Sequence, residues 1–419
     1  MSKCLVVGGG LLGLSTAMSL HERGFEVEVL EANSGVGLEA SFANGGLLTS
    51  AMSDPWNAPG VHKHLAASMF DPASPMKLNL GQIPSLSLWG LRFLRNSSHA
   101  RHSKAIAANY QLSRYSMGKT REWGDRLNLH YEAASAGTMK IFRTGASVDA
   151  PLAIAKKLAA QGMQFQQLDA AGAVALEPQL EPIKAEINSA LYFPEDETGD
   201  AYLFCKALTD RLKHAGVSVH TDVQVRELVI RKGRVCGLRC DNNEFVADSV
   251  VLASGNGTPA LLRGTGVSIS IAPAKGYSVT FDVKDVETLP KVGVIDDVLH
   301  ACVVSLGARL RAVGTAEFVG FDKRIEQVRV DNLVNLIKSV FPKIASSLVL
   351  SASENWVGFR PLSSDGVPFV GPTPIAGLYL NTGHGHLGWT MAVGSAELLA
   401  DQIAGSETEI SSAPYRVGR

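Results

Sequence analysis

The sequence lacks several features that would point to whole classes of protein. No uninterrupted run of about 18 apolar residues occurs, so we expect no membrane-spanning helix. The net charge is only −1 and neither sign forms a long block, which argues against a nucleic-acid partner. The five cysteines are odd in number and widely scattered, which suits the reduced thiols of a cytoplasmic protein better than a disulfide framework.

Metal-binding patterns are also missing. Cys236 and Cys240 lie in an alternating strand with no His or further Cys nearby to complete a ligand set, so we predict no metal site. Residues 195–200 are rich in acids and could form a calcium loop. However, Asp200 fits better as the N-cap of a helix over residues 203–214, and we favour that interpretation.

The strongest positive signal is the N-terminal segment 4–31. An apolar run typical of a buried strand leads into the spacing G-x-G-x-x-G, an expected helix over 14–23 and a second strand over 26–30. This order is the context that a dinucleotide-binding fingerprint requires. The segment therefore predicts the start of a Rossmann-like domain, without deciding between FAD and NAD.

Each residue of the fingerprint has a physical role. Gly8 permits a tight turn, Gly10 lets backbone amides approach a pyrophosphate, and Gly13 lets the helix pack close to the sheet. The N-terminus of the helix adds free N–H groups and the positive end of its dipole. Glu31 stands where an acid accepts the ribose hydroxyls, and its charge disfavours the 2′-phosphate of an NADP-type ligand.

Two later segments extend this domain. Alternating residues over 217–246 predict a β-meander, and a continuous apolar run over 249–254 predicts a strand that returns to the central sheet. Near the C-terminus the glycine-rich turn 382–388 leads into a helix over 389–403, whose N-terminus is a second place for an electron-rich ligand. No second G-x-G-x-x-G occurs, so we expect one dinucleotide site.

The apolar and aromatic segment Leu86–Leu94 has two interpretations. It predicts either a core helix or, because Arg92 and Arg95 are close by, a patch on a membrane surface. We favour the core helix, because apolar residues usually indicate burial and the segment is short for an interfacial helix.

With these motifs in place, the chain resembles the FAD-dependent D-amino acid dehydrogenases (small subunit) of bacteria. That family belongs to the wider flavoprotein group of D-amino acid oxidase, glycine oxidase and sarcosine oxidase. The similarity runs nearly end to end. The stretches that carry it are Ser41–Gly46, Pro55–Gly60, Gly137–Arg143, Asp196–Asp200, Lys275–Ser278, Gly358–Pro361, Asp365–Pro368, Asn381–Gly385 and Leu387–Met391.

The resemblance implies FAD rather than NAD, and a mixed α/β (α+β) fold of two discontinuous domains. A Rossmann-like FAD-binding domain with the β-meander would comprise residues 1–75, 199–268 and 355–419. A substrate-binding domain, with a mostly antiparallel sheet and flanking helices, would comprise residues 76–198 and 269–354.

The resemblance also implies which residues hold FAD, from the fingerprint to the C-terminal turn. They are Gly8, Gly10, Leu11, Leu12, Gly13, Glu31 and Ala32 at the ADP half, Val223, Ala253, Ser254 and Gly255 around the adenosine, Ser41, Asn44, Gly45 and Gly46 beside the flavin ring, and Gly385, Leu387, Gly388, Trp389 and Thr390 at its pyrimidine end.

Four residues are candidates for the chemistry. By resemblance, Arg360 binds the substrate carboxylate with help from Tyr277, and an arginine before a proline turn suits a rigid bidentate fork; the alternative is a buried structural ion pair. His384 and His386 are either general bases or polar packing and gating residues. We favour packing, because relatives oxidise the neutral amine without an obligatory base.

The implied reaction is oxidative deamination of D-amino acids to 2-oxo acids and ammonia, by hydride transfer from Cα to flavin N5. Electrons would pass to a quinone or respiratory acceptor, from a protein that is cytoplasmic or peripheral on the cytoplasmic face of the inner membrane. The alternatives are oxidation of glycine or of secondary amino acids such as proline, hydroxyproline or sarcosine, and an electron-relay or assembly subunit. Met52, Asp54 and His386 depart from the family pattern near the flavin, so the resemblance does not extend to the preferred side chain.

Overall fold

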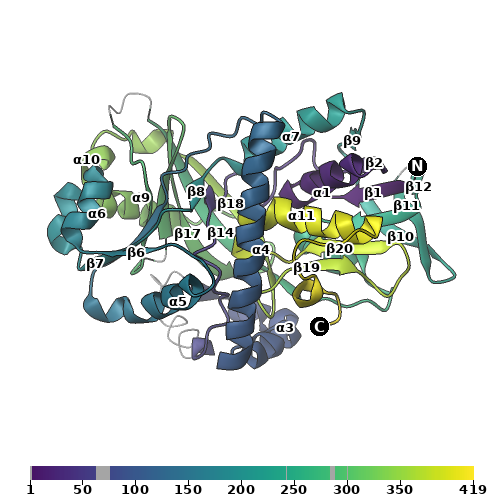
Figure 1. The fold of residues 1–419 in the computed structure, drawn as a ribbon, viewed down its shortest axis with the longest axis horizontal. Coiled ribbons are helices and arrows are strands. Elements are labelled where there is room, and N and C mark those ends of the chain that lie inside the picture. The colour runs from purple at the N-terminus through teal and green to yellow at the C-terminus, as the bar shows by residue number, and fades with distance from the viewer. Residues whose placement is uncertain (1, 63–75, 242, 284–287, 300) are drawn as a thin grey trace.

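The computed structural model describes residues 2–62, 76–241, 243–283, 288–299 and 301–419. Within these ranges two large β-sheets with flanking helices lie side by side, and the long helix α4 (His99–Arg126) crosses the face of the molecule that is toward the viewer in Figure 1. The mixed α/β fold is the one that the sequence predicts.

The N-terminal strand lies inside a six-stranded sheet to which both ends of the chain contribute. β1 pairs in parallel with β2 and with β13, and β13 pairs in parallel with β20. Only the edge strand β19 runs antiparallel to its neighbour. In spatial order the strands are β19 (Phe369–Pro372), β20 (Leu378–Thr382), β13 (Ser249–Leu252), β1 (Lys3–Val7), β2 (Glu26–Leu30) and β9 (Ser218–His220).

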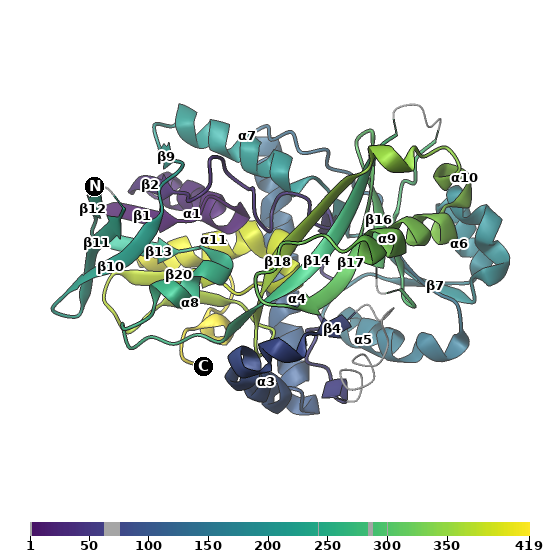
Figure 2. The same ribbon diagram turned by 180° about the vertical axis from the view of Figure 1, so that it is seen from behind.

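Side chains of this sheet alternate between two cores, as expected of parallel strands that are covered on both faces. Val6 and Val251 pack against helices, whereas Leu5 and Val250 pack against a three-stranded antiparallel meander (Figure 2). The predicted meander and return strand are confirmed, except that residues 218–220 form β9 and pair with β2. The helices are α1 (Leu11–Glu22), α4, α7 (Ala201–His214) and α11 (Gly388–Ala404), and the meander is β10 (Val225–Arg231), β11 (Arg234–Cys240) and β12 (Glu244–Val246).

The second sheet has nine strands and is mostly antiparallel. The amphipathic helix α9 (Gln327–Val340) packs on it. The strands are β18 (Glu354–Ser363), β14 (Ile271–Asp282), β17 (Arg309–Phe318), β16 (Ala301–Leu306), β15 (Gly293–Asp296), β5 (Thr138–Phe142), β7 (Ser189–Phe193), β6 (Gln166–Leu168) and β4 (Met76–Leu78), with helices α5 (Asp149–Ala159), α6 (Ala170–Leu176), α8 (Thr258–Leu261) and α10 (Pro342–Ala345) elsewhere in the fold.

The division into two discontinuous domains remains a proposal. β18 pairs with β14 along its length, so strand pairing attaches residues 354–363 to the nine-stranded sheet. Residue 75, where the first proposed segment ends, lies outside the described residues. A short ribbon of β3 (Leu47–Leu48) and β8 (Glu197–Thr198) adds a further link between the parts.

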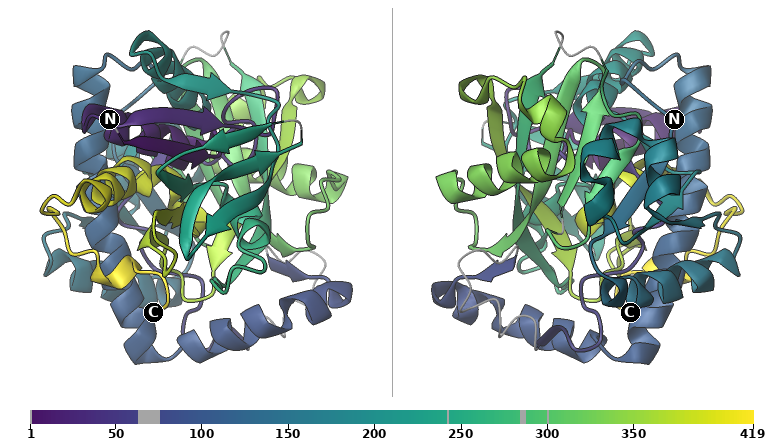
Figure 3. Two further views of the ribbon diagram at one scale, coloured as in Figure 1. Left: turned by 90° about the vertical axis from the view of Figure 1, so that its right-hand side faces the viewer. Right: turned by 90° about the vertical axis from the view of Figure 1, so that its left-hand side faces the viewer.

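The favoured interpretation of residues 86–94 as a core helix is wrong. They belong to α3 (Ile83–Asn96), of which only Phe93 is buried. The helix lies at the periphery of the molecule (Figure 3), where one of its faces packs on the protein and no other element among the described residues covers the opposite face. No helix in the described ranges, α3 included, is long and apolar enough to cross a membrane.

One buried carboxylate joins segments that are far apart in the sequence. Asp196 accepts hydrogen bonds from the hydroxyls of Thr49 (2.5 Å) and Thr138 (2.7 Å) and from the backbone N–H of Ser50 (3.1 Å). Burial raises the pKa of Asp196 to about 6.

This raised pKa predicts a pH-dependent stability. Because the folded chain binds the Asp196 proton more tightly than the unfolded chain, the free energy of unfolding falls as the pH rises from about 4 to about 6. Over this pH range we expect the free energy of unfolding of the wild type to fall by about 2–3 kcal/mol relative to that of Asp196→Asn, as measured by denaturant unfolding. Asp210→Asn, which changes an exposed carboxylate on α7, is the control. A stability difference between the wild type and Asp196→Asn that is independent of pH contradicts the prediction.

Candidate active site

Residues of both sheets line one large cavity. Its volume is about 1660 Å³, above the roughly 300–1,000 Å³ that is usual for small-ligand sites. Glu31 and Val223 lie along one part of its wall, and Trp56 and Arg360 lie along another. The cavity therefore has room for an extended ligand together with a smaller one.

At the first part of the cavity, α1 begins without a side-chain cap. Its N-cap residue is Gly10, and its first turn contains no acid. The N–H of Leu11 donates to Oγ of Ser41 at 3.3 Å, and the N–H groups that follow it in the first turn can face an anion. Gly8 has a φ of +110°, and a Cβ on it would lie 2.8 Å from the carbonyl oxygen of Ala253. A Cβ on Gly13 would collide with the carbonyl oxygen of Gly8. Gly13 thus acts in helix packing, as predicted, and does not line the cavity.

The carboxylate of Glu31 is held in place at the end of β2. Its Oε2 accepts the N–H of Gly9 at 2.6 Å, and its Oε1 accepts the backbone N–H (2.8 Å) and side-chain amide (2.7 Å) of Asn33. Carboxylate oxygens have further lone pairs, so Glu31 can still accept hydroxyl donors. The orienting role of Asn33 was not predicted, because no motif marks it.

A second uncapped helix begins at the cavity wall. α11 follows β20 and a turn in which Gly383 and Gly385 have φ of +81° and +56°. Its N-terminus has no side-chain cap and no acid in the first turn. Thr390 accepts the N–H of Thr49 at 3.1 Å, which ties this helix end to the residue that follows β3. The predicted second site for an electron-rich ligand is therefore present as a free helix N-terminus.

Two buried polar groups in the cavity wall lack hydrogen-bond partners among the described residues. Neither ring nitrogen of His384 has one, and neither does Oδ1 of Asn256. Burial lowers the pKa of His384 to about 3, so its ring is neutral. Buried polar atoms normally find partners, so these atoms fit a ligand that carries donors and acceptors. Together with the two helix N-termini, this wall fits a dinucleotide such as FAD.

Arg360 lies on β18 with its guanidinium in the cavity. Nη1 donates to the carbonyl oxygen of Thr315 at 3.0 Å, and no carboxylate of the described residues pairs with Arg360. Among the described residues, the alternative of a structural ion pair thus finds no acid partner. Burial lowers its pKa only to about 10, so the group keeps its charge at neutral pH. A Cβ on Gly276 would collide with the guanidinium, so a glycine is needed opposite the arginine.

A stacked aromatic pair adjoins the guanidinium. The rings of Trp56 and His386 lie 5.5 Å apart at 13°, and Cζ of Arg360 lies 5.6 Å from the Trp56 ring centre. Nε2 of His386 lies 3.0 Å from the carbonyl oxygen of Met52, to which it donates in the neutral form. Burial lowers the pKa of His386. Trp56 was not among the predicted site residues, although the Pro-Trp motif that contains it carries part of the resemblance.

The structure does not support the predicted role of Tyr277 in binding the substrate carboxylate. Its ring lines the cavity, but its hydroxyl donates to Glu317 at 3.0 Å. Glu317 in turn pairs with Arg329 at 2.8 Å in the core beneath the sheet. Because this ion pair engages the hydroxyl, we leave Tyr277 out of the proposed carboxylate site.

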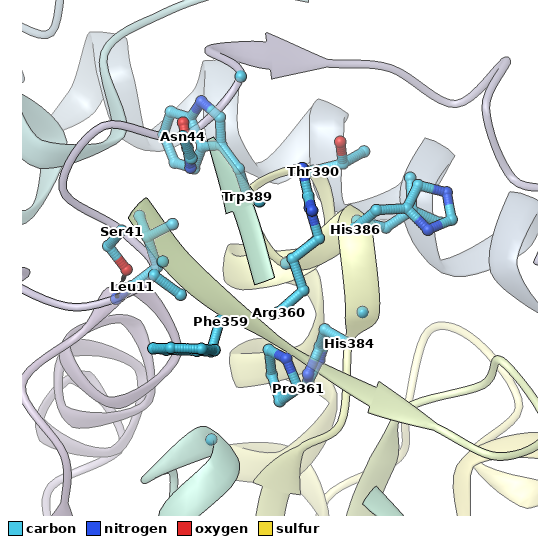
Figure 4. A pocket seen from close by; sticks show the side chains of 18 of the residues that line it. Leu11, Ser41, Asn44, Phe359, Arg360, Pro361, His384, His386, Trp389 and Thr390 are labelled. Atoms are coloured by element: carbon cyan, nitrogen blue, oxygen red, sulfur yellow. Dashed lines mark hydrogen bonds between the residues drawn. The ribbon is translucent and has the colours of Figure 1, made fainter. Parts of the chain in front are cut away.

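Apart from Gly13, all the other predicted site residues line the same cavity, although they come from segments more than 350 residues apart in the sequence. Figure 4 shows Leu11 and Ser41 at one part of the wall and Arg360, His384 and His386 at another. The full set on the wall is Gly8, Gly10, Leu11, Leu12, Glu31, Ala32, Ser41, Asn44, Gly45, Gly46, Val223, Ala253, Ser254, Gly255, Arg360, His384, Gly385, His386, Leu387, Gly388, Trp389 and Thr390.

The acids of residues 195–200 have a structural role. Asp200 accepts the N–H groups of Tyr202 (2.9 Å) and Leu203 (3.0 Å), which confirms it as the N-cap of α7. It also pairs with Arg309 at 2.9 Å. In the part of the chain that the structure describes, no three His, Cys, Asp or Glu side chains are grouped so as to hold a metal ion.

Comparison with known proteins gives concordant matches. Residues 3–402 match the model of the FAD dependent oxidoreductase family (DAO). The chain is 34% identical to a D-amino acid dehydrogenase of Vibrio cholerae over 411 residues, covering 98% of this chain and 97% of the relative. It is also 34% identical to a D-amino acid dehydrogenase of Granulibacter bethesdensis over 417 residues, covering 100% of this chain and 99% of the relative.

Solved structures of low sequence identity share the fold. Glycine oxidase from Geobacillus kaustophilus superimposes with a TM-score of 0.76 at 23% identity, covering 100% of this chain and 99% of the other. L-proline dehydrogenase from P. horikoshii superimposes with a TM-score of 0.76 at 17% identity, covering 99% of this chain and 96% of the other.

The close packing of α1 on the sheet predicts the effect of Gly13→Ala. The added methyl group would push the N-terminus of α1 away from the Gly8 turn, so we expect the variant to be purified without bound flavin, as measured by its visible absorbance. Gly118→Ala in α4 is the control, because an added Cβ there meets no atom within 4 Å. Full flavin content in Gly13→Ala, with both variants folded by circular dichroism, contradicts the prediction.

Proposed function

Because this chain belongs to the family of FAD-dependent oxidoreductases and FAD is its cofactor, we propose that it oxidises D-amino acids to 2-oxo acids and ammonia. The curated relatives named D-amino acid dehydrogenase support this substrate class. The observation that carries the proposal is the guanidinium of Arg360, charged and without an ion-pair partner among the described residues of the cavity wall.

Arg360 would bind the carboxylate of the substrate. One N–H is used by Thr315, and the others remain for a bidentate pair, which is strong and directional. The apolar surroundings and the Trp56 ring strengthen this pairing by keeping water from the guanidinium. FAD, when bound, supplies the acceptor for the hydride that leaves Cα of the substrate.

The two histidines would act as neutral polar groups. Burial lowers the pKa of both rings, which favours their neutral forms and makes them weak bases. His386 is fixed by its donation to Met52 and by stacking on Trp56. The substrate amine would therefore enter in its neutral form, and positioning would be the main contribution of the protein.

The electron acceptor would be a quinone or another respiratory carrier, since the curated relatives are named dehydrogenases. The enzyme would accordingly act in the cytoplasm, in contact with the cytoplasmic face of the inner membrane.

A second candidate reaction is oxidation of a cyclic secondary amino acid such as proline or hydroxyproline. The stacked rings of Trp56 and His386 form a flat wall beside Arg360, which suits a ring-shaped substrate. A third candidate, an electron-relay subunit, requires no substrate carboxylate and leaves the unpaired Arg360 unexplained.

Anaerobic mixing with D- and L-amino acids separates these candidates. We expect D-amino acids with small or apolar side chains to bleach the flavin absorbance, because each two-electron oxidation reduces one FAD. Bleaching by cyclic or N-methyl amino acids alone would favour the second candidate. Absence of bleaching by every amino acid would favour the third.

Substitution of Arg360 tests the carboxylate site. Loss of a desolvated charge pair should raise KM of Arg360→Ala at least ~100-fold, while flavin content stays unchanged. The KM of Arg360→Lys should lie between those of the wild type and Arg360→Ala, because an ammonium keeps the charge but lacks the planar fork of a guanidinium. Arg239→Ala, on the exposed surface of β11, is the control and should match the wild type. An unchanged KM in Arg360→Ala would refute the assignment.

A further inference from the structure

Helix α3 has an apolar face that no described part of the chain covers. Leu91 is 68% exposed, Leu88 61%, Ile83 45% and Leu94 44%. At 3.6 residues per turn these positions fall on one side of the helix. Single exposed leucines are ordinary on protein surfaces, but a contiguous apolar group on one helix face marks an interaction surface.

The opposite face of α3 is firmly attached to the protein. Trp89 donates its indole N–H to the carbonyl oxygen of Leu362 at 3.0 Å and stacks on Phe93 at 4.8 Å. It also lies 5.4 Å from the ring of Phe318. The outward direction of the leucines is therefore fixed by the packing of the inner face, and Leu362 belongs to β18, the strand that carries Arg360.

Helix α3 itself carries basic side chains and no acid. Arg92 and Arg95 on α3 lie beside the exposed leucines in the sequence, and Lys104 in the first turns of α4 is exposed. In the sequence, no Asp or Glu occurs between Asp71 and Glu122. The Lys and Arg residues of that interval are Lys77, Arg92, Arg95, Arg101, Lys104, Arg114, Lys119 and Arg121. Of this set, Arg92 and Arg95 on α3 and Arg101 and Lys104 in the first turns of α4 are exposed.

We propose that the outer face of α3 rests on the surface of an anionic lipid bilayer. Leu88, Leu91 and their neighbours enter the boundary between headgroups and acyl chains, and Arg92 and Arg95 pair with lipid phosphates. An apolar stripe beside basic residues is the pattern of a helix that lies in the membrane plane. The inference deepens the membrane contact of the proposed function, and it rests on that function only for the identity of the acceptor.

The charge distribution disfavours a second copy of the chain as the occupant. A two-fold dimer would place this face against itself, since such an interface uses the same patch on both subunits. The arginines of one copy would then meet those of the other without any acid from this segment to pair with them. Anionic lipid supplies the missing charge.

The test uses the FAD-loaded full chain and vesicles of phosphatidylcholine with or without phosphatidylglycerol. The wild type should sediment with the anionic vesicles and be released by salt, because the lipid phosphates are screened. Leu88→Ser with Leu91→Ser should lower the partition coefficient at least ~tenfold. The double variant Arg92→Gln with Arg95→Gln should have a partition coefficient about tenfold lower than the wild type, and only on the anionic vesicles.

Val349→Ser with Leu350→Ser is the matched control, since these residues are 65% and 44% exposed at a different place on the surface. This variant should bind as the wild type does, and all variants should keep the wild-type melting temperature. Failure of the wild type to bind, or equal loss in the control, overturns the proposal. The proposal is also overturned if light scattering shows that the wild type is a dimer and that the variant Leu88→Ser with Leu91→Ser is a monomer.

Flavin reduction by soluble amino acids, measured without vesicles, separates this proposal from the proposed function. Absence of vesicle binding with normal reduction overturns the membrane surface alone. Vesicle binding without reduction by any amino acid overturns the proposed substrate class and leaves the surface supported.

Discussion

The pairing of β1 with β13, and of β13 with β20, is the constraint on which the site depends. Because these strands are parallel, their carboxyl ends meet at one edge of the sheet, and α1 and α11 both begin there. Two positive helix ends from opposite termini of the chain thus adjoin one cavity. The two helices are then held together along their length. Arg23 of α1 pairs with Glu397 and Asp401 of α11, and Ser19 donates to Glu397.

The two parts of the cavity differ in how their polar groups are balanced. At the dinucleotide part, the carboxylate of Glu31 already accepts three hydrogen bonds from the protein and is rigid before any ligand arrives. At the part lined by Arg360, the guanidinium has one backbone partner and no counter-charge among the described residues. A preorganised acceptor at one part and an uncompensated cation at the other suit different ligand groups: hydroxyl donors beside Glu31 and an anion beside Arg360.

The features that could be predicted from the sequence are those with a local cause. The spacing of Gly8, Gly10 and Gly13 and the alternation of apolar residues depend on neighbours within a few positions. β9 was misassigned because its alternation resembles that of the meander, whereas its partner β2 lies about 190 residues away. The direction of the Tyr277 hydroxyl depends on Glu317 and Arg329, a pair that only the folded sheet and α9 bring together. The apolar residues of segment 86–94 likewise predicted helix α3, but they did not indicate which of its faces the rest of the protein would cover.

The glycine opposite Arg360 has a consequence for how such a site can change over generations. The guanidinium fills the space that a side chain at Gly276 would need. A side chain at 276 would therefore displace the guanidinium, and the two positions are epistatic: each limits the replacements that the other tolerates. Position 276 would become free to vary more easily after Arg360 is replaced by a smaller residue that leaves the space open.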